Sequence, residues 1–260
     1  MNASDPAPQL AGQWAIVTGA SKGIGRGIAR RLVAAGANVV MVARGEADLK
    51  RAADEIGEDG GSGQTVLPIV ADAGNRDDIA GVFARLRAEV PRLDILIANA
   101  GTGSVQPFLE IESQEWDRII GLNLTGTFHW CQEAARMMRD TGEAGDNRAI
   151  VVVSSVRPRG VRPGRLPYSV SKAGLNQLVR MAAYELGPLG IRVNALTPGL
   201  TATDLALSNP GFFEEQVALL PLGRAGQPAD MGEAALFLVS PASAFITGAN
   251  LAIDGGESLW

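Results

Sequence analysis

Residues 14–25, WAIVTGASKGIG, join a short apolar run to a glycine-rich turn and then to the start of a helical pattern. The apolar run is rich in β-branched side chains and is too short for an ordinary helix, so we expect a strand. Gly19, Gly23 and Gly25 follow it and allow the backbone to turn sharply before the helix begins. A strand, a glycine turn and a helix in this order form the first part of a βαβ unit.

The same alternation of apolar strands and amphipathic helices continues along the chain. We predict strands over residues 14–18, 38–43, 65–70, 95–98, 149–154, 192–196 and 250–253. We predict helices over residues 24–35, 47–58, 77–90, 114–139, 168–186 and 228–239. The strands are apolar throughout, which is typical of a parallel sheet covered by helices on both faces. The prediction is an α/β fold with a doubly wound, seven-stranded parallel sheet (Rossmann-like). It forms a single domain over residues 12–260, after a flexible tail over residues 1–11.

The composition excludes several classes of protein. Of the 260 residues, 46% are apolar and 20% charged, which is typical of a globular chain with a large core. The formal net charge of −5 argues against nucleic acid or an anionic membrane as the main partner. No apolar run reaches the ~20 residues needed to span a bilayer, and residues 1–12 lack a signal-peptide pattern. We therefore expect a cytoplasmic protein with neither kind of partner.

The chain contains one cysteine, Cys131, and one histidine, His129. An intrachain disulfide is therefore impossible, and a zinc site of the common nitrogen and sulfur types is excluded. A Ser-His-Asp hydrolase would depend on His129, and no G-x-S-x-G turn precedes a helix. We expect no bound metal and an inert Cys131 inside a packed helix.

Ligands of doubly wound sheets bind beyond the carboxyl ends of the strands, so the loops after the strands are the places to search for chemistry. The glycine turn after the first strand would bring backbone amides and a helix N-terminus to a pyrophosphate. Its glycine spacing differs from G-x-G-x-x-G, and a tight turn without a ligand is the alternative. Its position in the first βα turn favours phosphate binding. The candidate contacts are Gly19, Ser21, Lys22, Gly23, Ile24 and Gly25.

The end of the second strand indicates which dinucleotide would bind. An acidic residue there would accept hydrogen bonds from the adenosine ribose and favour NAD(H), but the chain has Ala43-Arg44. Arg44 can pair with a 2′-phosphate, and Lys22 could supply a second cation. A solvated surface arginine is the alternative. We therefore predict NADP(H) as the cofactor, with NAD(H) the less favoured choice.

Two further loops contribute candidate contacts. Asp72, followed by Ala73, could accept a hydrogen bond from the adenine amine, although a turn-forming aspartate is nearly as good an interpretation. Asn99, Ala100 and Gly101 follow the fourth strand, and such small residues would let a loop approach the cofactor closely. Taken alone, that tripeptide is only a turn signal.

The segment with the most candidate catalytic residues runs from the end of the fifth strand into the helix that follows. Tyr168 and Lys172 are four residues apart and so share one helical face. A phenol with a pKa near 10 transfers protons poorly at neutral pH, whereas a neighbouring ammonium would stabilise the phenolate. Ser155 offers a hydroxyl that could hold and polarise a substrate oxygen. The Y-x-x-x-K spacing is common by chance, but its position near Ser155 favours proton transfer to or from a carbonyl or alcohol.

The motifs together resemble the short-chain dehydrogenase/reductase family over residues 12–256, most closely its 3-oxoacyl-(acyl carrier protein) reductase-like members. Each motif is common by itself, whereas their order and spacing are highly specific. The resemblance rests on T-G-x-x-x-G-x-G at residues 18–25, N-A-G at 99–101, Asn123, Ser155 thirteen residues before Tyr168, Y-x-x-x-K at 168–172, Pro198-Gly199, and D-G-G at 254–256.

The resemblance implies a role for each matching residue. Tyr168 would be the general acid in reduction and the base in oxidation, and Ser155 would bond the substrate oxygen. Lys172 would lower the pKa of Tyr168 and hold the nicotinamide ribose, while Asn123 would hold a water that links Lys172 to solvent. The loop P-G-x-x-x-T would surround the nicotinamide and phosphates; its residues are Pro198, Gly199, Thr201 and Thr203, with Thr201 where the family usually has Ile or Val. The family is commonly tetrameric, so we expect a homotetramer.

The substrate is the part that the sequence leaves open. Residues 157–165 carry four arginines, which predict either a cationic rim for an anionic substrate or acyl carrier, or a solvated or ion-paired loop. Residues 200–222 include Pro210-Gly211-Phe212-Phe213 and are expected to form a mobile apolar lid. We expect an NADP(H)-dependent enzyme that interconverts a carbonyl and a secondary alcohol. The alternatives are a 3-oxoacyl thioester reductase and a non-catalytic dinucleotide-binding sensor or scaffold.

Overall fold

The computed structural model describes residues 9–59, 63–143, 145–157, 160–207 and 210–259. Its seven strands form one parallel sheet in the order β3-β2-β1-β4-β5-β6-β7. Strands β2 and β3 lie on one side of β1 and β4 to β7 on the other, so the topological switch point lies between β1 and β4. The strands are β1 Trp14–Thr18, β2 Asn38–Ala43, β3 Val66–Val70, β4 Ile95–Ala98, β5 Arg148–Val153, β6 Ile191–Pro198 and β7 Asn250–Ile253. The predicted doubly wound α/β fold is confirmed.

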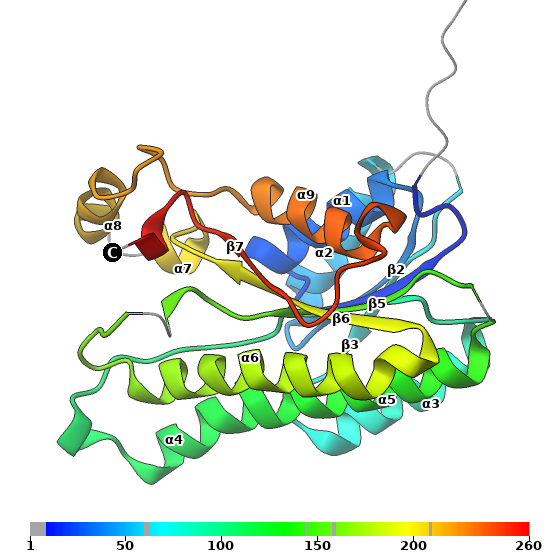
Figure 1. Ribbon diagram of the computed structural model, residues 1–260, viewed down its shortest axis with the longest axis horizontal. Helices are drawn as coiled ribbons and strands as arrows, with labels where there is room; N and C mark the ends of the chain where they lie inside the picture. Colours follow the sequence, from blue (N-terminus) through cyan, green and yellow to red (C-terminus); the bar gives the residue numbers. More distant parts are fainter. Residues whose placement is uncertain (1–8, 60–62, 144, 158–159, 208–209, 260) are drawn as a thin grey trace, which may run out of the picture.

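Helices cover both faces of the sheet (Figure 1). Helices α1, α2 and α9 lie on one face, and α3, α4, α5 and α6 lie on the other. Their bounds are α1 Gly23–Ala34, α2 Glu46–Asp59, α3 Arg76–Glu89, α4 Ser113–Ile120, α5 Thr127–Thr141, α6 Leu166–Leu186 and α9 Pro228–Val239. Each face buries its own apolar cluster, because residues that alternate along the central strands point to opposite sides. No helix of the described part of the chain is long and apolar enough to cross a membrane.

One end of the molecule gathers the segments that surround the candidate site. Short helices α7 Asp204–Leu207 and α8 Pro210–Ala218 lie there, beside the C-terminal turn η6 Glu257–Leu259. The first turn of α6 points to the same end (Figure 1). The segment for which we expect a lid is therefore largely helical, and its Ser208 and Asn209 lie outside the described residues.

Two predicted boundaries are wrong. The single helix expected over residues 114–139 is divided into α4 and α5 by the π-helical turn η2 Gly121–Gly126. An apolar pattern does not distinguish i→i+5 from i→i+4 hydrogen bonding, so the sequence showed one helix. The tail was predicted to extend to residue 11, yet Leu10 is fully buried and its amide donates to the Ala35 carbonyl at 2.9 Å.

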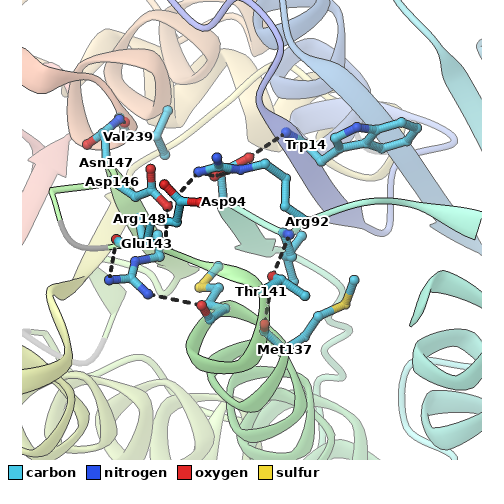
Figure 2. Close-up of polar contacts among 12 residues, drawn as sticks. Trp14, Arg92, Asp94, Met137, Thr141, Glu143, Asp146, Asn147, Arg148 and Val239 are labelled. Atoms are coloured by element: carbon cyan, nitrogen blue, oxygen red, sulfur yellow. Dashed lines mark hydrogen bonds and ion pairs between the residues drawn. The ribbon is translucent and has the colours of Figure 1, made fainter. Parts of the chain in front are cut away.

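A polar network lies at the amino-terminal ends of the central strands (Figure 2). Asp94, directly before β4, is fully buried and accepts a hydrogen bond from the Trp14 amide at 2.9 Å. Arg92 donates to the same carboxylate through Nε at 2.8 Å and pairs with Asp146 at 2.9 Å. Arg148, the first residue of β5, donates to backbone carbonyls of the neighbouring segments. The amino-terminal ends of the strands lie opposite the carboxyl ends, where the candidate site is expected, so the charges of this network stabilise the fold rather than form the site.

Candidate functional site

The glycine turn after β1 is packed against the loop after β4. Thr18 Oγ1 accepts hydrogen bonds from the amides of Asn99 and Ala100, both at 3.0 Å. Asn99 Nδ2 donates to the Thr18 carbonyl at 2.9 Å. Gly19 has φ +65°, and a Cβ at Gly25 would lie 2.3 Å from the Gly19 carbonyl oxygen. Both positions therefore require glycine, and N-A-G holds the turn in place rather than acting only as a turn signal.

The N-terminus of α1 fits an anionic phosphate. Lys22 is its N-cap residue and makes no side-chain capping bond, and the first turn contains no acidic residue. By contrast, α3 is capped by the Asn75 side chain and carries Asp77 in its first turn. The first amides of α1 therefore have no side-chain acceptor, while the helix dipole favours negative charge there.

The loop after β6 meets the same turn. Gly199 donates its amide to the Ile253 carbonyl at 3.1 Å, which follows the register of Pro198 with Ile253. Thr201 is buried and forms an isolated β-bridge with Gly226. A Cβ at Gly23 would lie 3.3 Å from Thr203 Cγ2. The structure thus brings the predicted P-G-x-x-x-T loop and the glycine turn together.

Arg44 lies beyond the end of β2 and is largely exposed, with 71% of its side chain accessible. Its Nη1 atom is 3.7 Å from Asp72 Oδ2. The other Asp72 oxygen accepts from the Gly74 amide at 2.8 Å, so the interpretation of Asp72 as a turn former holds. Ala73 follows and is buried, with its carbonyl accepting from the Trp130 indole at 3.2 Å. Lys22 is exposed, and in the described ranges no ion pair or hydrogen bond joins it to Arg44.

The four residues expected to transfer protons come from three elements. Ser155 follows β5, Tyr168 and Lys172 lie on α6, and Asn123 lies in η2. The Ser155 hydroxyl lies close enough to the Tyr168 phenol to favour its ionised form. Lys172 Nζ lies 5.8 Å from the centre of the Tyr168 ring and donates to the Val153 carbonyl at 2.8 Å. The structure therefore gathers these side chains where β5, α6 and η2 meet.

The Asn123 amide is fully buried and holds the loop after β4. Its Oδ1 accepts from the Thr102 amide at 2.8 Å, and its Nδ2 donates to the Thr102 carbonyl at 2.8 Å and to Ser171 Oγ at 3.1 Å. A Cβ at Gly101 would lie 3.3 Å from Asn123 Oδ1 and 3.5 Å from Lys172 Nζ. The missing side chain at Gly101 leaves space between these two polar atoms.

Burial dominates the electrostatics of the pair on α6. Burial lowers the pKa of Lys172 to about 8. Burial also raises the pKa of Tyr168, while the Ser155 hydrogen bond and then the nearby guanidinium groups of Arg157 and Arg165 oppose that rise. The cations that act on Tyr168 in this direction are Arg157 and Arg165, and the expected effect of Lys172 on the pKa of Tyr168 stays a prediction. The phenol is therefore protonated at neutral pH and able to donate a proton.

Glu257 is a part of the site that our sequence reasoning missed. Only 10% of its side chain is exposed, and its Oε1 lies 2.8 Å from Arg157 Nη1 and 3.6 Å from Arg162 Nη2. Its Oε2 accepts from the Leu200 amide at 2.6 Å. The available signal was its position after β7 and the D-G-G motif, in one of the loops that follow the strands. Arg159 of the arginine loop lies outside the described residues.

Cys131 takes no part in this arrangement. It is buried on α5, and burial raises the pKa of its thiol to about 12. A thiol of this kind is neutral and unreactive at neutral pH. The predicted inert core cysteine is confirmed.

Comparison with known proteins places this geometry in a family. A family model described as enoyl-(acyl carrier protein) reductase matches residues 19–258. The galactitol 2-dehydrogenase (L-tagatose-forming) of Cereibacter sphaeroides is 37% identical, with 97% of each chain covered. The cis-4-hydroxycyclohexanecarboxylate dehydrogenase of Sinomonas cyclohexanicum is 38% identical, covering 93% of this chain and 95% of the relative.

The fold agrees equally well with a solved structure. A short-chain type dehydrogenase/reductase from Mycobacterium marinum superposes with a TM-score of 0.87 at 35% identity, covering 95% of this chain and 96% of that one. The chain therefore belongs to the short-chain dehydrogenase/reductase family of NAD(P)-dependent oxidoreductases, which interconvert carbonyls and alcohols.

Proposed function

We propose that this protein is an NADP(H)-dependent oxidoreductase that interconverts a carbonyl and a secondary alcohol, with Tyr168 as the general acid and base. The observation that carries the proposal is the placement of the Ser155 hydroxyl and the Tyr168 phenol close together, beside the buried ammonium of Lys172. A sensor or scaffold would need the glycine turn but not this arrangement. The nicotinamide, when bound, supplies or accepts the hydride.

The chain's own residues divide the remaining work. The Ser155 hydroxyl holds the substrate oxygen, and Tyr168 gives it a proton in reduction or removes one in oxidation. Lys172, held by the Val153 carbonyl, binds the nicotinamide ribose. The space left by Gly101 between Asn123 and Lys172 supports a water that links the ammonium to solvent. Pro198, Gly199, Thr201 and Thr203 close the cofactor loop, and α7 and α8 within residues 200–222 form a lid over the substrate.

The proposed preference for NADP(H) rests on Arg44. Its exposed guanidinium lies beyond β2, where a 2′-phosphate could replace the distant Asp72 carboxylate as its partner. Lys22 and the uncapped start of α1 add to the attraction for phosphate.

Changing Arg44→Asp is expected to shift cofactor preference from NADPH toward NADH by about 10- to 100-fold. The new carboxylate would repel the 2′-phosphate and accept hydrogen bonds from the ribose hydroxyls. The ratio of the two dissociation constants, measured by fluorescence titration, checks this without any substrate. Arg51→Asp on α2 makes the same charge change at an exposed site and should leave the ratio within about twofold. An unchanged ratio in Arg44→Asp would reject the role of Arg44.

The activity itself is tested by NADPH oxidation with a panel of ketones, aldehydes, keto acids and 3-oxoacyl thioesters. We expect turnover on at least one neutral or anionic ketone, with NADPH preferred over NADH. Turnover confined to 3-oxoacyl thioesters would instead establish the narrower reductase. Absence of turnover across the panel, with intact NADPH binding, would favour the non-catalytic alternative.

The homotetramer and the cytoplasmic location stay predictions. Apolar side chains on the outer faces of α5 and α6 support self-association, since Phe128, Met181 and Tyr184 are exposed by 42%, 51% and 84%.

A further inference from the structure

Three described arginines of the segment between β5 and α6, Arg157, Arg162 and Arg165, lie near Tyr168 or near the Glu257 carboxylate. Glu257 pairs with Arg157 at 2.8 Å and lies 3.6 Å from Arg162. Arg165 lies near enough to Tyr168 and Arg162 to act electrostatically on both. Among the described residues of this group, the three guanidinium groups outnumber the Glu257 carboxylate that pairs with them, although the whole chain carries a formal charge of −5.

The positive charge that lacks a carboxylate partner among the described residues is mainly that of Arg165. Arg157 is held by Glu257, whereas among the described residues no ion pair or side-chain hydrogen bond occupies the Arg165 guanidinium. A Cβ at Gly103 would lie 3.3 Å from Tyr168 Cδ2 and 3.5 Å from Arg165 Nη1. The guanidinium and the phenol ring therefore both border the space that Gly103 leaves open.

The neighbouring Arg162, with 38% of its side chain exposed, belongs to the same group of charges. Burial lowers the pKa of Arg162, and the positive charges of Arg157 and Arg165 lower it further against the opposing effect of Glu257. Like charges brought together in a partly buried site destabilise one another unless an anion joins them. A carboxylate would fit the planar guanidinium fork with two parallel hydrogen bonds.

We propose that the substrate is a hydroxy acid or keto acid whose carboxylate is bound by Arg165, with Arg162 beside it. The proposal rests on the proposed function, because the reacting carbon must then face Tyr168 and Ser155. Arg165 is the N-cap residue of α6 and precedes Tyr168 by less than one helical turn. The Arg165 guanidinium and the Tyr168 ring border the same space beside Gly103, so a small molecule would present its carboxylate to one and its reacting carbon to the other.

A binding measurement tests the anion site without turnover. Isothermal titration compares cyclohexanecarboxylate with cyclohexanecarboxamide, which has nearly the same shape and no charge, in the presence of NADP⁺. We expect the carboxylate to bind at least 10-fold tighter. Arg165→Gln should remove that difference, Arg165→Lys should retain part of it, and thermal unfolding shows that each variant is folded. The matched control is Arg180→Gln, an exposed arginine of α6 about 22 Å further along the helix from Arg165, which should leave the difference unchanged.

A kinetic measurement then connects the anion site to the reaction. NADPH oxidation is followed with 4-oxocyclohexanecarboxylate and with its methyl ester. We expect kcat/KM to favour the acid at least 10-fold, and Arg165→Gln to reduce this ratio at least 10-fold, mainly through the KM for the acid.

The possible failures are distinguishable. Equal binding of carboxylate and carboxamide, or an Arg165→Gln variant that keeps the preference, would overturn the carboxylate site. Tighter binding of cyclohexyl phosphate than of the carboxylate would overturn the choice of carboxylate. Carboxylate binding that depends on Arg165, with no NADPH oxidation on any ketone, would support the anion site and overturn the proposed function.

Discussion

Replacing Tyr168 by phenylalanine is expected to lower kcat for carbonyl reduction by about 10²- to 10⁴-fold, the usual contribution of a positioned general acid. The raised pKa of Tyr168 keeps the phenol protonated at neutral pH, so the wild-type side chain is ready to donate. Phenylalanine keeps the ring that borders Gly103 but loses the hydroxyl that carries the proton and interacts with Ser155. The measurement is the rate of NADPH oxidation on a ketone at saturating concentration.

The chain provides a matched control for this substitution. Its second tyrosine, Tyr184, lies on the same helix and is 84% exposed. Tyr184→Phe should leave kcat within about twofold, because Tyr184 lies about 24 Å from Tyr168 along α6. NADPH should bind Tyr168→Phe within a few-fold of wild type, since the glycine turn, Lys172 and the loop after β6 are untouched. Undiminished turnover in Tyr168→Phe would reject the proposed proton donor.

The site was predictable where chemistry depends on residues close in sequence. The turn of residues 18–25 and the four-residue spacing of Tyr168 and Lys172 are local patterns whose geometry follows from strand and helix periodicity. The strands were equally accessible, because a parallel sheet buried on both faces requires continuous apolar runs. For this reason the predicted strands differ from those observed by at most two residues at either end.

Features that depend on distant residues were not predictable. Glu257 and Arg157 are a hundred residues apart, and only the order of β5, β6 and β7 in the sheet brings them together. The arginine loop consequently allowed two interpretations, a cationic rim and an ion-paired loop. In the structure Arg157 is paired with Glu257, while Arg165 lies beside Tyr168. The position of Asn123 in a π-helical turn was likewise hidden, because that turn depends on backbone hydrogen bonds.

The electrostatics of the site also required the fold. Proximity in sequence suggested that Lys172 controls the pKa of Tyr168, but burial acts on both groups and shifts them in opposite directions. Burial lowers the pKa of the ammonium to about 8 and raises the pKa of the phenol, since each loses solvation of its charged form. Arg157 and Arg165 supply the positive charge that favours the phenolate, so the loop proposed to bind the substrate also adjusts its proton donor.

The second large effect is expected at the amino-terminal ends of the strands, away from the candidate site. Asp94→Ala should lower the free energy of unfolding by about 3 kcal/mol or more. Asp94 is fully buried, and its loss leaves the Trp14 amide without its acceptor and Arg92 without one of its two carboxylates. Arg92 keeps Asp146 at 2.9 Å and is one-third exposed, which limits the cost. Urea-induced unfolding measures the change, and the melting temperature should fall by roughly 6–12 °C for a chain of this size.

Two comparisons separate this network from general sensitivity to charge removal. Glu89→Ala breaks an exposed ion pair with Arg85 and should cost no more than about 0.5 kcal/mol. Asp94→Asn keeps an acceptor for the Trp14 amide but removes the charge, so it should lie between Glu89→Ala and Asp94→Ala. The folded Asp94→Ala protein should retain kcat within about twofold, because Asp94 precedes β4 whereas Ser155 follows β5, at the opposite edge of the sheet. A large loss of kcat with unchanged stability would contradict the conclusion that the amino-terminal ends of the strands stabilise the fold while the carboxyl ends carry the reaction.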